Sequence, residues 1–119
     1  MKVIDAHTHL GKFPVFGESI TLKGLLTLME EYDIEKAVVS SLPNSLTREA
    51  IENHPDRFTG LVRVNPREAD AAAKAEEAIA DQGFKGVKLN PFFNNFLPDS
   101  PVVDPVMDVA ARRRVPVLI

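Results

Sequence analysis

The sequence contains no cysteine and no tryptophan, and it has one tyrosine and six glycines among its 119 residues. The absence of cysteine excludes a disulfide framework and any thiolate nucleophile or metal ligand. No apolar run approaches the roughly 20 residues that a transmembrane helix needs. Asp5 interrupts the first apolar segment almost at once, which argues against a signal peptide. We therefore expect a cytoplasmic protein with no membrane partner.

A strong excess of charge of one sign is also missing. The net charge is −3, and the only dense basic run is Arg112 to Arg114, a pattern typical of the last turn of a helix. Proteins that bind nucleic acids usually present a basic face, so we expect no nucleic-acid partner. The length and the hydrophobic content of 45% are typical of one soluble domain, here residues 1–119.

The chain alternates between short apolar stretches and longer amphipathic stretches. The amphipathic stretches predict helices, the first capped by Thr21 or Ser19, the third ended by Gly83, and the fourth capped by Asp104 ahead of Pro105. The segments around 11–17 and 90–101 are expected to be loops. We expect strands at 3–4, 37–40, 58–64, 84–89 and 115–119, and helices at 22–29, 45–53, 69–81 and 104–113.

This order of elements predicts an α/β fold with parallel strands. The strands are apolar nearly throughout, as parallel strands buried on both faces should be. A complete eight-stranded (β/α) barrel of the TIM type needs at least ~200 residues. We therefore expect about half of such a barrel, with four strand–helix units and the start of a fifth strand. An open five-stranded parallel sheet is the alternative.

Two histidines follow the first apolar segment, in the run Asp5-Ala6-His7-Thr8-His9. Side chains two positions apart on a strand share one face, so His7 and His9 are expected to reach the same metal ion. Neutral imidazole is a common ligand of zinc and also suits iron, nickel and copper. The pair stands where a strand gives way to a loop, and ligands of α/β proteins usually bind at that end of a strand.

Four stretches of the chain resemble the amidohydrolase-related metal-dependent hydrolases, which are (β/α)₈ barrels. The resemblance runs in order along the whole chain and gains its specificity from that order. The stretches are Val3 to Leu10, His54 to Gly60 with Val64-Asn65-Pro66, Gly83 to Pro91, and Val115 to Ile119.

The resemblance implies that His7 and His9 are two ligands of a divalent metal, with zinc expected first and manganese or iron as alternatives. In the family a third histidine ligand follows the run like 115–119, and a later strand supplies an aspartate that binds metal and activates water. We therefore expect the chain to correspond to the first half of such an enzyme and to be inactive alone.

The resemblance also points to further site residues. Asp5 either orients His7 or is satisfied by backbone groups. In some members a lysine at the position of Lys88 is carboxylated and bridges two metals, whereas in others it pairs with a substrate carboxylate; otherwise its stem packs and its amine reaches solvent. Members often have histidine where this chain has Asn90. Asn90, Phe92 and Phe93 are expected to contact substrate, although the two rings could equally cover the barrel mouth.

The expected reaction is hydrolysis of an amide, ester or lactone bond by metal-activated water. One alternative is non-oxidative decarboxylation of an aromatic or unsaturated acid on the same scaffold. The other is a catalytically inactive half-barrel that self-associates. The expected partners are a small-molecule substrate, possibly a carboxylic acid, and further copies of the chain joined through exposed sheet edges.

Overall fold

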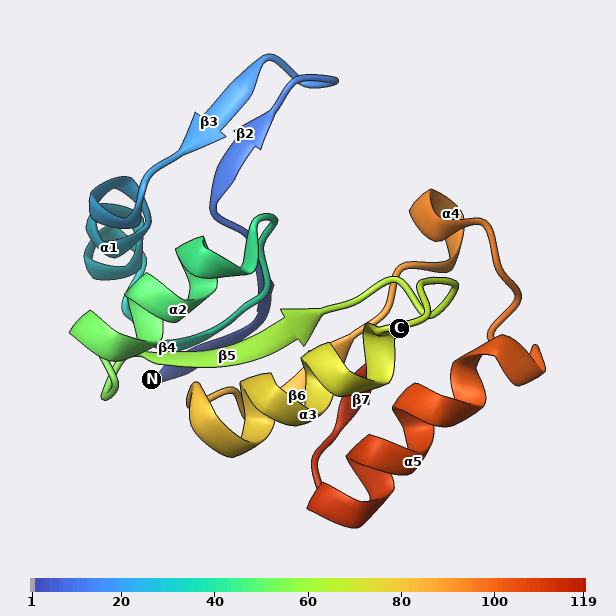
Figure 1. Cartoon of the computed structure of the whole chain (residues 1–119). Coiled ribbons are helices and arrows are strands. Elements are labelled where there is room, and N and C mark those ends of the chain that lie inside the picture. The colour runs from blue at the N-terminus through green and yellow to red at the C-terminus, as the bar shows by residue number, and fades with distance from the viewer. Residues whose placement is uncertain (1) are drawn as a thin grey trace. The chain divides into compact units, whose positions relative to one another are not determined.

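The computed structural model describes residues 2–119, and the chain falls into two compact units (Figure 1). One unit runs to Gly60 and the other from Leu61 to Ile119. The boundary lies within one strand, β5 (Phe58–Arg63). Its first residues pair within the first unit and its last residues pair within the second. The expectation of one domain over the whole chain stays a prediction.

The first unit is a parallel arrangement of strands with helical crossovers. β1 pairs in parallel with β4, and β4 pairs in parallel with the first residues of β5. The hydroxyl of Thr21 accepts a hydrogen bond from Gly24 N at 3.0 Å, so Thr21 is the cap of α1. The elements are β1 (Val3–Thr8), β2 (Gly11–Phe13), β3 (Glu18–Ile20), α1 (Leu22–Glu31), β4 (Ile34–Val39) and α2 (Asn44–Asn53).

A β-hairpin occupies the segment after β1 that the sequence predicted to be a loop. Strands β2 and β3 are antiparallel, with Gly11 paired to Ile20 and Phe13 paired to Glu18. Phe16 N donates to Phe13 O at 2.9 Å and closes the turn. The prediction was wrong because glycine and proline dominate the local pattern, whereas the cross-strand pairing that stabilises these short strands leaves little local signal.

The second unit repeats the same architecture. The last residues of β5 pair in parallel with β6, and β6 pairs in parallel with β7. All three residues of β6 are buried, as expected for a strand covered on both faces. Besides its part of β5, the unit contains α3 (Ala71–Asp81), β6 (Gly86–Lys88), α4 (Pro91–Asn94), the 3₁₀ turn η1 (Pro101–Val103), α5 (Asp104–Arg113) and β7 (Val117–Leu118).

Two details of the second unit correct the expectations from sequence. The segment predicted to be a loop at 90–101 contains the short helix α4 and the start of η1. Asp104 is the first residue of α5 and not its cap; the turn η1 leads directly into the helix, and Ser100 caps that turn. Gly83 follows α3 with a φ of 80°, as its predicted role at the helix end requires.

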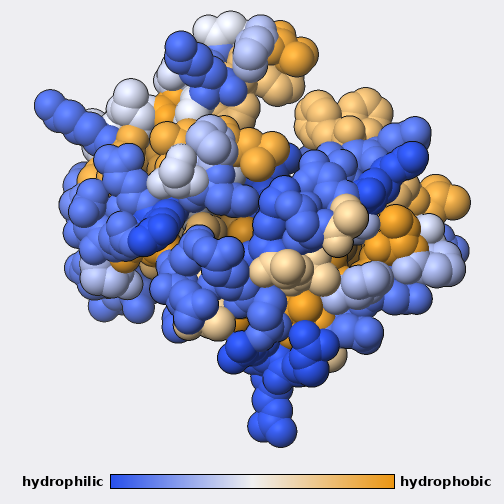
Figure 2. Space-filling view, viewed as in Figure 1, coloured by the Kyte–Doolittle hydropathy of each residue, from blue (hydrophilic) through white to orange (hydrophobic). Residues whose placement is uncertain are grey.

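The strand order β1-β4-β5-β6-β7, with every pair parallel, confirms the predicted α/β fold class. No helix within residues 2–119 is long and apolar enough to cross a bilayer. The face of the molecule in Figure 2 is mostly hydrophilic, with apolar side chains at the end of the β2–β3 hairpin and over α4. The most exposed apolar residues in these places are Val15, Phe16, Phe92 and Phe93.

Glycine lets helix α2 lie close against β5 in the first unit. A Cβ atom added to Gly60 would stand 2.9 Å from Thr47 Cγ2 and 3.1 Å from Ile51 Cγ2. Both neighbours lie on α2 and are buried. Any larger residue at position 60 would therefore push α2 away from the strand.

Candidate functional site

The structure brings His7 and His9 together in the first unit. His7 lies in β1, and His9 comes just after the strand, which ends at Thr8. The pairing of β1 with β4 shifts register between Asp5 and Thr8, so the regular alternation assumed from sequence does not extend to His9. The two imidazole rings nevertheless meet edge to face, with centroids 4.8 Å apart and planes at 79°.

This separation fits two imidazoles that share one metal ion. With metal–nitrogen distances of about 2.0–2.1 Å and angles between tetrahedral and right-angled, the two ring centroids should lie roughly 4.5–5.2 Å apart. The observed 4.8 Å falls in that range. The donor type also fits, because neutral imidazole binds zinc and other divalent transition metals. The histidine pair can therefore supply two ligands, and the ligand role itself stays a prediction.

Contacts with Ser40 orient the ring of His9 and favour one tautomer. Its Nδ1 atom makes a short contact with the backbone carbonyl of Ser40, and a carbonyl oxygen can only accept a hydrogen bond. This contact favours the tautomer with the proton on Nδ1 and, in the neutral ring, the lone pair on Nε2. The hydroxyl of Ser40 lies 3.4 Å from the same Nδ1 atom and can accept from its N–H as well. Metal-binding histidines are typically held in this way, with the second ring nitrogen donating to a carbonyl or a carboxylate.

Asp5 contacts the main chain of the histidine segment. Its Oδ1 atom accepts a hydrogen bond from the backbone N–H of His7 at 3.0 Å. The sequence left two roles open for Asp5, orienting His7 or being satisfied by backbone groups. This hydrogen bond corresponds to the second role. Within residues 2–119, no group of three or more histidine, cysteine, aspartate or glutamate side chains comes together to hold a metal ion.

Lys88 is the buried charged residue of the second unit. It is 6% exposed on β6, where its register partners are Arg63 on β5 and Leu118 on β7. Burial lowers the pKa of the Lys88 ammonium, and the positive charge of Arg63 lowers it further. Burial likewise lowers the pKa of Arg63. The structure thus holds a poorly solvated cation beside a second cation, an environment that favours an anionic ligand.

Asn90, Phe92 and Phe93 lie at the start of α4 in the second unit. The Oδ1 atom of Asn90 accepts a hydrogen bond from Phe93 N at 3.1 Å and so caps this short helix. Phe92 is 88% exposed and Phe93 is 71% exposed. The two rings lie edge to face with centroids 5.4 Å apart. The capping contact gives Asn90 a structural role, and substrate contact by these three residues stays a prediction.

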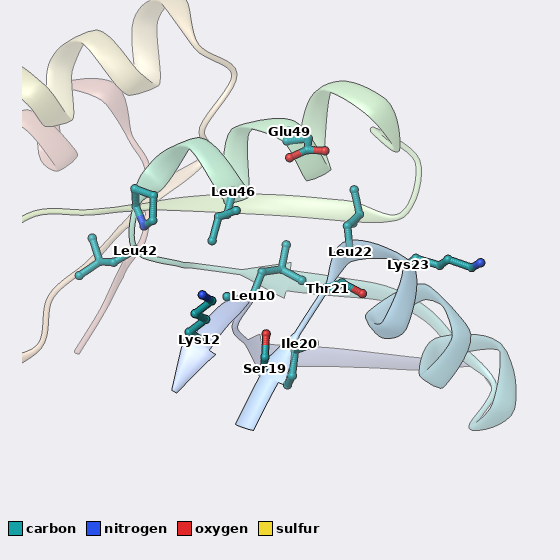
Figure 3. A pocket seen from close by; sticks show the side chains of 12 residues that line it. Leu10, Lys12, Ser19, Ile20, Thr21, Leu22, Lys23, Leu42, Leu46 and Glu49 are labelled. Atoms are coloured by element: carbon teal, nitrogen blue, oxygen red, sulfur yellow. The ribbon is translucent and has the colours of Figure 1, made fainter. Parts of the chain in front are cut away.

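A separate pocket of about 640 Å³ lies in the first unit beside the hairpin (Figure 3). In Figure 3 the side chain of Leu10, one of the lining residues, lies between the hairpin and Leu46 of α2. Its lining is largely apolar, and Lys12, Lys23 and Glu49 add charged groups. Neither His7 nor His9 lines it, so this pocket is distinct from the histidine pair.

Three buried residues behind His9 were missed by the sequence reasoning. Ser40, Ser41 and Thr47 are each at most 1% exposed. They belong to the turn between β4 and α2 and to the first half of α2. The available signal was a pair of serines directly after an apolar strand, followed by a threonine inside a helix, where hydroxyl groups are otherwise uncommon.

Comparison with known proteins places these features in a family. Residues 4–119 match the family model described as Amidohydrolase. Among curated proteins, none matches this sequence significantly.

Solved structures of low sequence identity share the fold. A 5-carboxyvanillate decarboxylase from Novosphingobium aromaticivorans, complexed with manganese and 4-hydroxy-3-methoxy-5-nitrobenzoic acid, has a TM-score of 0.82 and 15% identity, over 97% of this chain and 49% of that chain. The 2,6-dihydroxybenzoate decarboxylase from Rhizobium has a TM-score of 0.73 and 18% identity, over 98% and 48%. A probable 2-pyrone-4,6-dicarboxylic acid hydrolase from Acinetobacter baumannii, with citric acid bound, has a TM-score of 0.73 and 20% identity, over 98% and 48%.

The chain spans about half the length of each of these structures. At such identities the likeness shows the fold alone, and the fold is that of half a (β/α) barrel.

Proposed function

The chain belongs to the amidohydrolase family, and from this premise we propose that His7 and His9 are two ligands of a divalent metal in an enzyme that acts on small carboxylic acids. The observation that carries this proposal is the edge-to-face pair of imidazoles, one of which has its Nδ1 atom turned to a backbone carbonyl. A histidine held in this tautomer presents Nε2 as its coordinating atom.

A divalent metal bound there would polarise a substrate oxygen and lower the pKa of a bound water to near neutrality. His7 and His9 would hold that ion. His9 is fixed by Ser40, and the main chain of His7 is fixed by Asp5. The similar decarboxylase structure contains manganese, which supports manganese as a candidate at least as well as zinc.

Lys88 supports a substrate that carries a carboxylate. Its buried ammonium lies beside Arg63, and an anion that pairs with it would relieve the cost of burying the charge. The similar structures from Novosphingobium and Acinetobacter contain acids of this kind, a nitrobenzoic acid and citric acid. We propose that Lys88 is not carboxylated and that its ammonium group pairs with the carboxylate of the substrate.

For the reaction we propose non-oxidative decarboxylation of an aromatic acid. In this reaction the bond between the ring and the carboxylate breaks, carbon dioxide leaves, and the ring carbon takes up a proton. Two of the three similar structures described above are decarboxylases of hydroxylated aromatic acids. Hydrolysis, the reaction expected first from the family resemblance, is the second candidate, and the similar structure from Acinetobacter is that of a probable 2-pyrone-4,6-dicarboxylic acid hydrolase.

Metal binding is tested by titrating zinc and manganese into the purified chain and following binding by calorimetry. The His7→Ala/His9→Ala double variant should lose the binding, whereas His54→Ala, which removes the remaining histidine of the sequence, should keep it. Equal binding by the wild type and the double variant would contradict the proposed site.

The reaction is tested with carboxyl-labelled hydroxybenzoic acids and with a pyrone dicarboxylic acid, each incubated with the purified chain and either metal. Labelled carbon dioxide indicates decarboxylation, and loss of the pyrone absorbance without carbon dioxide indicates hydrolysis. Turnover that survives in the His7→Ala/His9→Ala variant would show that the histidine pair does not serve the reaction.

A further inference from the structure

The Ser40–Ser41 segment contacts the chain on both sides of His9. Ser40 N donates to Thr8 O at 3.1 Å, so the residue before His9 is tied to this segment. Leu10 N donates to the hydroxyl of Ser41 at 2.7 Å, so the residue after His9 is tied as well. The ring of His9 is held in the middle by the Ser40 carbonyl. Two adjacent serines therefore fix the backbone and the ring of one candidate ligand.

Ser41 is itself held by helix α2. Its backbone N–H donates to Thr47 Oγ1 at 2.9 Å. Ser41 and Thr47 are both 0% exposed, so water cannot replace either hydrogen bond without opening the unit. Thr47 is positioned in turn by close contact between α2 and Gly60 on β5. A continuous set of buried contacts thus runs from β5 through α2 to His9.

We propose that Ser41 and Thr47 are positioning residues for His9: Thr47 holds Ser41, and Ser41 holds the Leu10 backbone so that the His9 ring meets the Ser40 carbonyl. The effect of this positioning on metal binding rests on the proposed function. The positioning of the His9 ring does not, because it can be measured without metal. Since outer residues that orient a ligand typically change metal affinity by 10–100-fold, loss of this set should weaken metal binding without removing any ligand.

The direct test reads the tautomer of His9 in the absence of metal. Nitrogen-15 NMR of the histidine side chains at about pH 8, above the ordinary range of histidine titration, distinguishes a protonated Nδ1 from a protonated Nε2. The wild type should show His9 with the proton on Nδ1. Ser41→Ala and Thr47→Val should shift His9 toward a mixture of tautomers, because the Ser40 carbonyl no longer meets the ring in one fixed geometry.

Matched variants separate positioning from general damage. Thr47→Ser keeps the hydroxyl that accepts from Ser41 and should preserve the wild-type tautomer, whereas Thr47→Val keeps the shape and loses the acceptor. Ser45→Ala removes an exposed serine of the same helix and should change nothing. If Thr47→Val does not fold, the comparison of Ser41→Ala with Ser45→Ala still decides the question.

The second readout is the affinity for manganese or zinc, measured in the same variants. Ser41→Ala should bind about tenfold more weakly than Ser45→Ala. If the folded Ser41→Ala variant keeps the wild-type tautomer of His9, the positioning role is overturned, regardless of the metal affinity of the variant. If instead the wild type binds no metal but the tautomer shifts as expected, the proposed function fails and the positioning of His9 stands.

Discussion

Arg63 and Lys88 are register partners on the parallel strands β5 and β6, so two cationic side chains leave the same face of the second unit from adjacent positions. Lys88 is almost completely buried, and both burial and the charge of Arg63 lower its pKa. The folded chain therefore binds the Lys88 proton less well than the unfolded chain does. This arrangement works against the stability of the fold and in favour of an anionic ligand.

Replacing Lys88 by methionine should stabilise the chain at neutral pH. The variant removes a buried charge and keeps a similar volume, and a gain of about 1 kcal/mol would raise Tm by about 4–8 °C. Because the folded pKa of Lys88 lies below the unfolded value of about 10.4, wild-type stability should rise with pH between these values and approach that of the variant. Thermal unfolding between pH 7 and pH 10 measures both effects. Lys85→Met, on an exposed residue of the same segment, is the control.

The same variant tests the proposed carboxylate recognition. A hydroxybenzoate added to the wild type should raise Tm, because a ligand that binds only the folded state stabilises it. The Lys88→Met variant should show no such rise, whereas Lys85→Met should respond like the wild type. A hydroxybenzoate effect that persists in Lys88→Met would argue against this role of Lys88.

Glu76 should stabilise the second unit in a pH-dependent manner. Its carboxylate accepts hydrogen bonds from Arg113 and Arg112 and joins α3 to α5. The hydrogen bond from Arg113 is the main cause that lowers the pKa of Glu76, with the charges of the two arginines adding to it. Because the pKa of Glu76 is lower in the folded chain than in the unfolded chain, its ion pair stabilises the fold at pH values above the unfolded pKa. This stabilisation is lost as the pH falls through the folded pKa.

Glu76→Gln should therefore lower Tm modestly at pH 7, and this loss should shrink as the pH falls toward 3. The effect should be modest because the ion pair is largely exposed to solvent and screened by salt. Glu77→Gln, on the exposed neighbour in the same helix, serves as control. An equal loss of Tm at pH 3 and pH 7 would mean that packing and not charge is responsible.

Gly60→Ala should destabilise the first unit through overpacking against α2. The new methyl group would stand 2.9 Å from Thr47 Cγ2, closer than side-chain carbons approach, and such overpacking typically costs about 1–3 kcal/mol. Combining it with Thr47→Ser removes that methyl group and should restore part of the loss, while contact with Ile51 at 3.1 Å keeps the rest. Urea denaturation of both single variants and the double variant measures this coupling. Strictly additive effects would contradict the proposed contact.

The regular elements were predictable because their signals are local. Apolar runs predicted the parallel strands, and Thr21 and Gly83 marked helix ends that the structure confirms. The hairpin at 11–20 was missed since its pairing of Gly11 with Ile20 depends on contacts across the turn. The capping role of Asn90 had a local signal, an asparagine ahead of Pro91, but the family resemblance led to the prediction of substrate contact instead.

Of the candidate site, only the histidine pair was predictable from the sequence. The spacing of His7 and His9 is a local pattern, and the structure brings the two rings together. The contact of His9 with Ser40 joins residues 31 positions apart, and nothing in the sequence near His9 indicates which carbonyl accepts its proton. The serine pair and Thr47 gave only a weak local signal, because the role of Ser41 and Thr47 follows from burial and from the packing of α2.

The 119-residue chain should self-associate through β1. Among the strands of residues 2–119, β1 is the first in the order β1-β4-β5-β6-β7 and pairs with β4 alone, and its Ile4 is 63% exposed. An end strand with exposed apolar side chains is a template for pairing with a second copy, and charged residues on such a strand oppose that pairing. Ile4→Lys should therefore shift the chain toward monomer, whereas Val15→Lys, at the similarly exposed hairpin tip, should not. Sedimentation velocity over a tenfold range of concentration distinguishes these outcomes. A wild type that stays monomeric at every concentration, or association that Val15→Lys abolishes and Ile4→Lys leaves intact, would contradict pairing through β1.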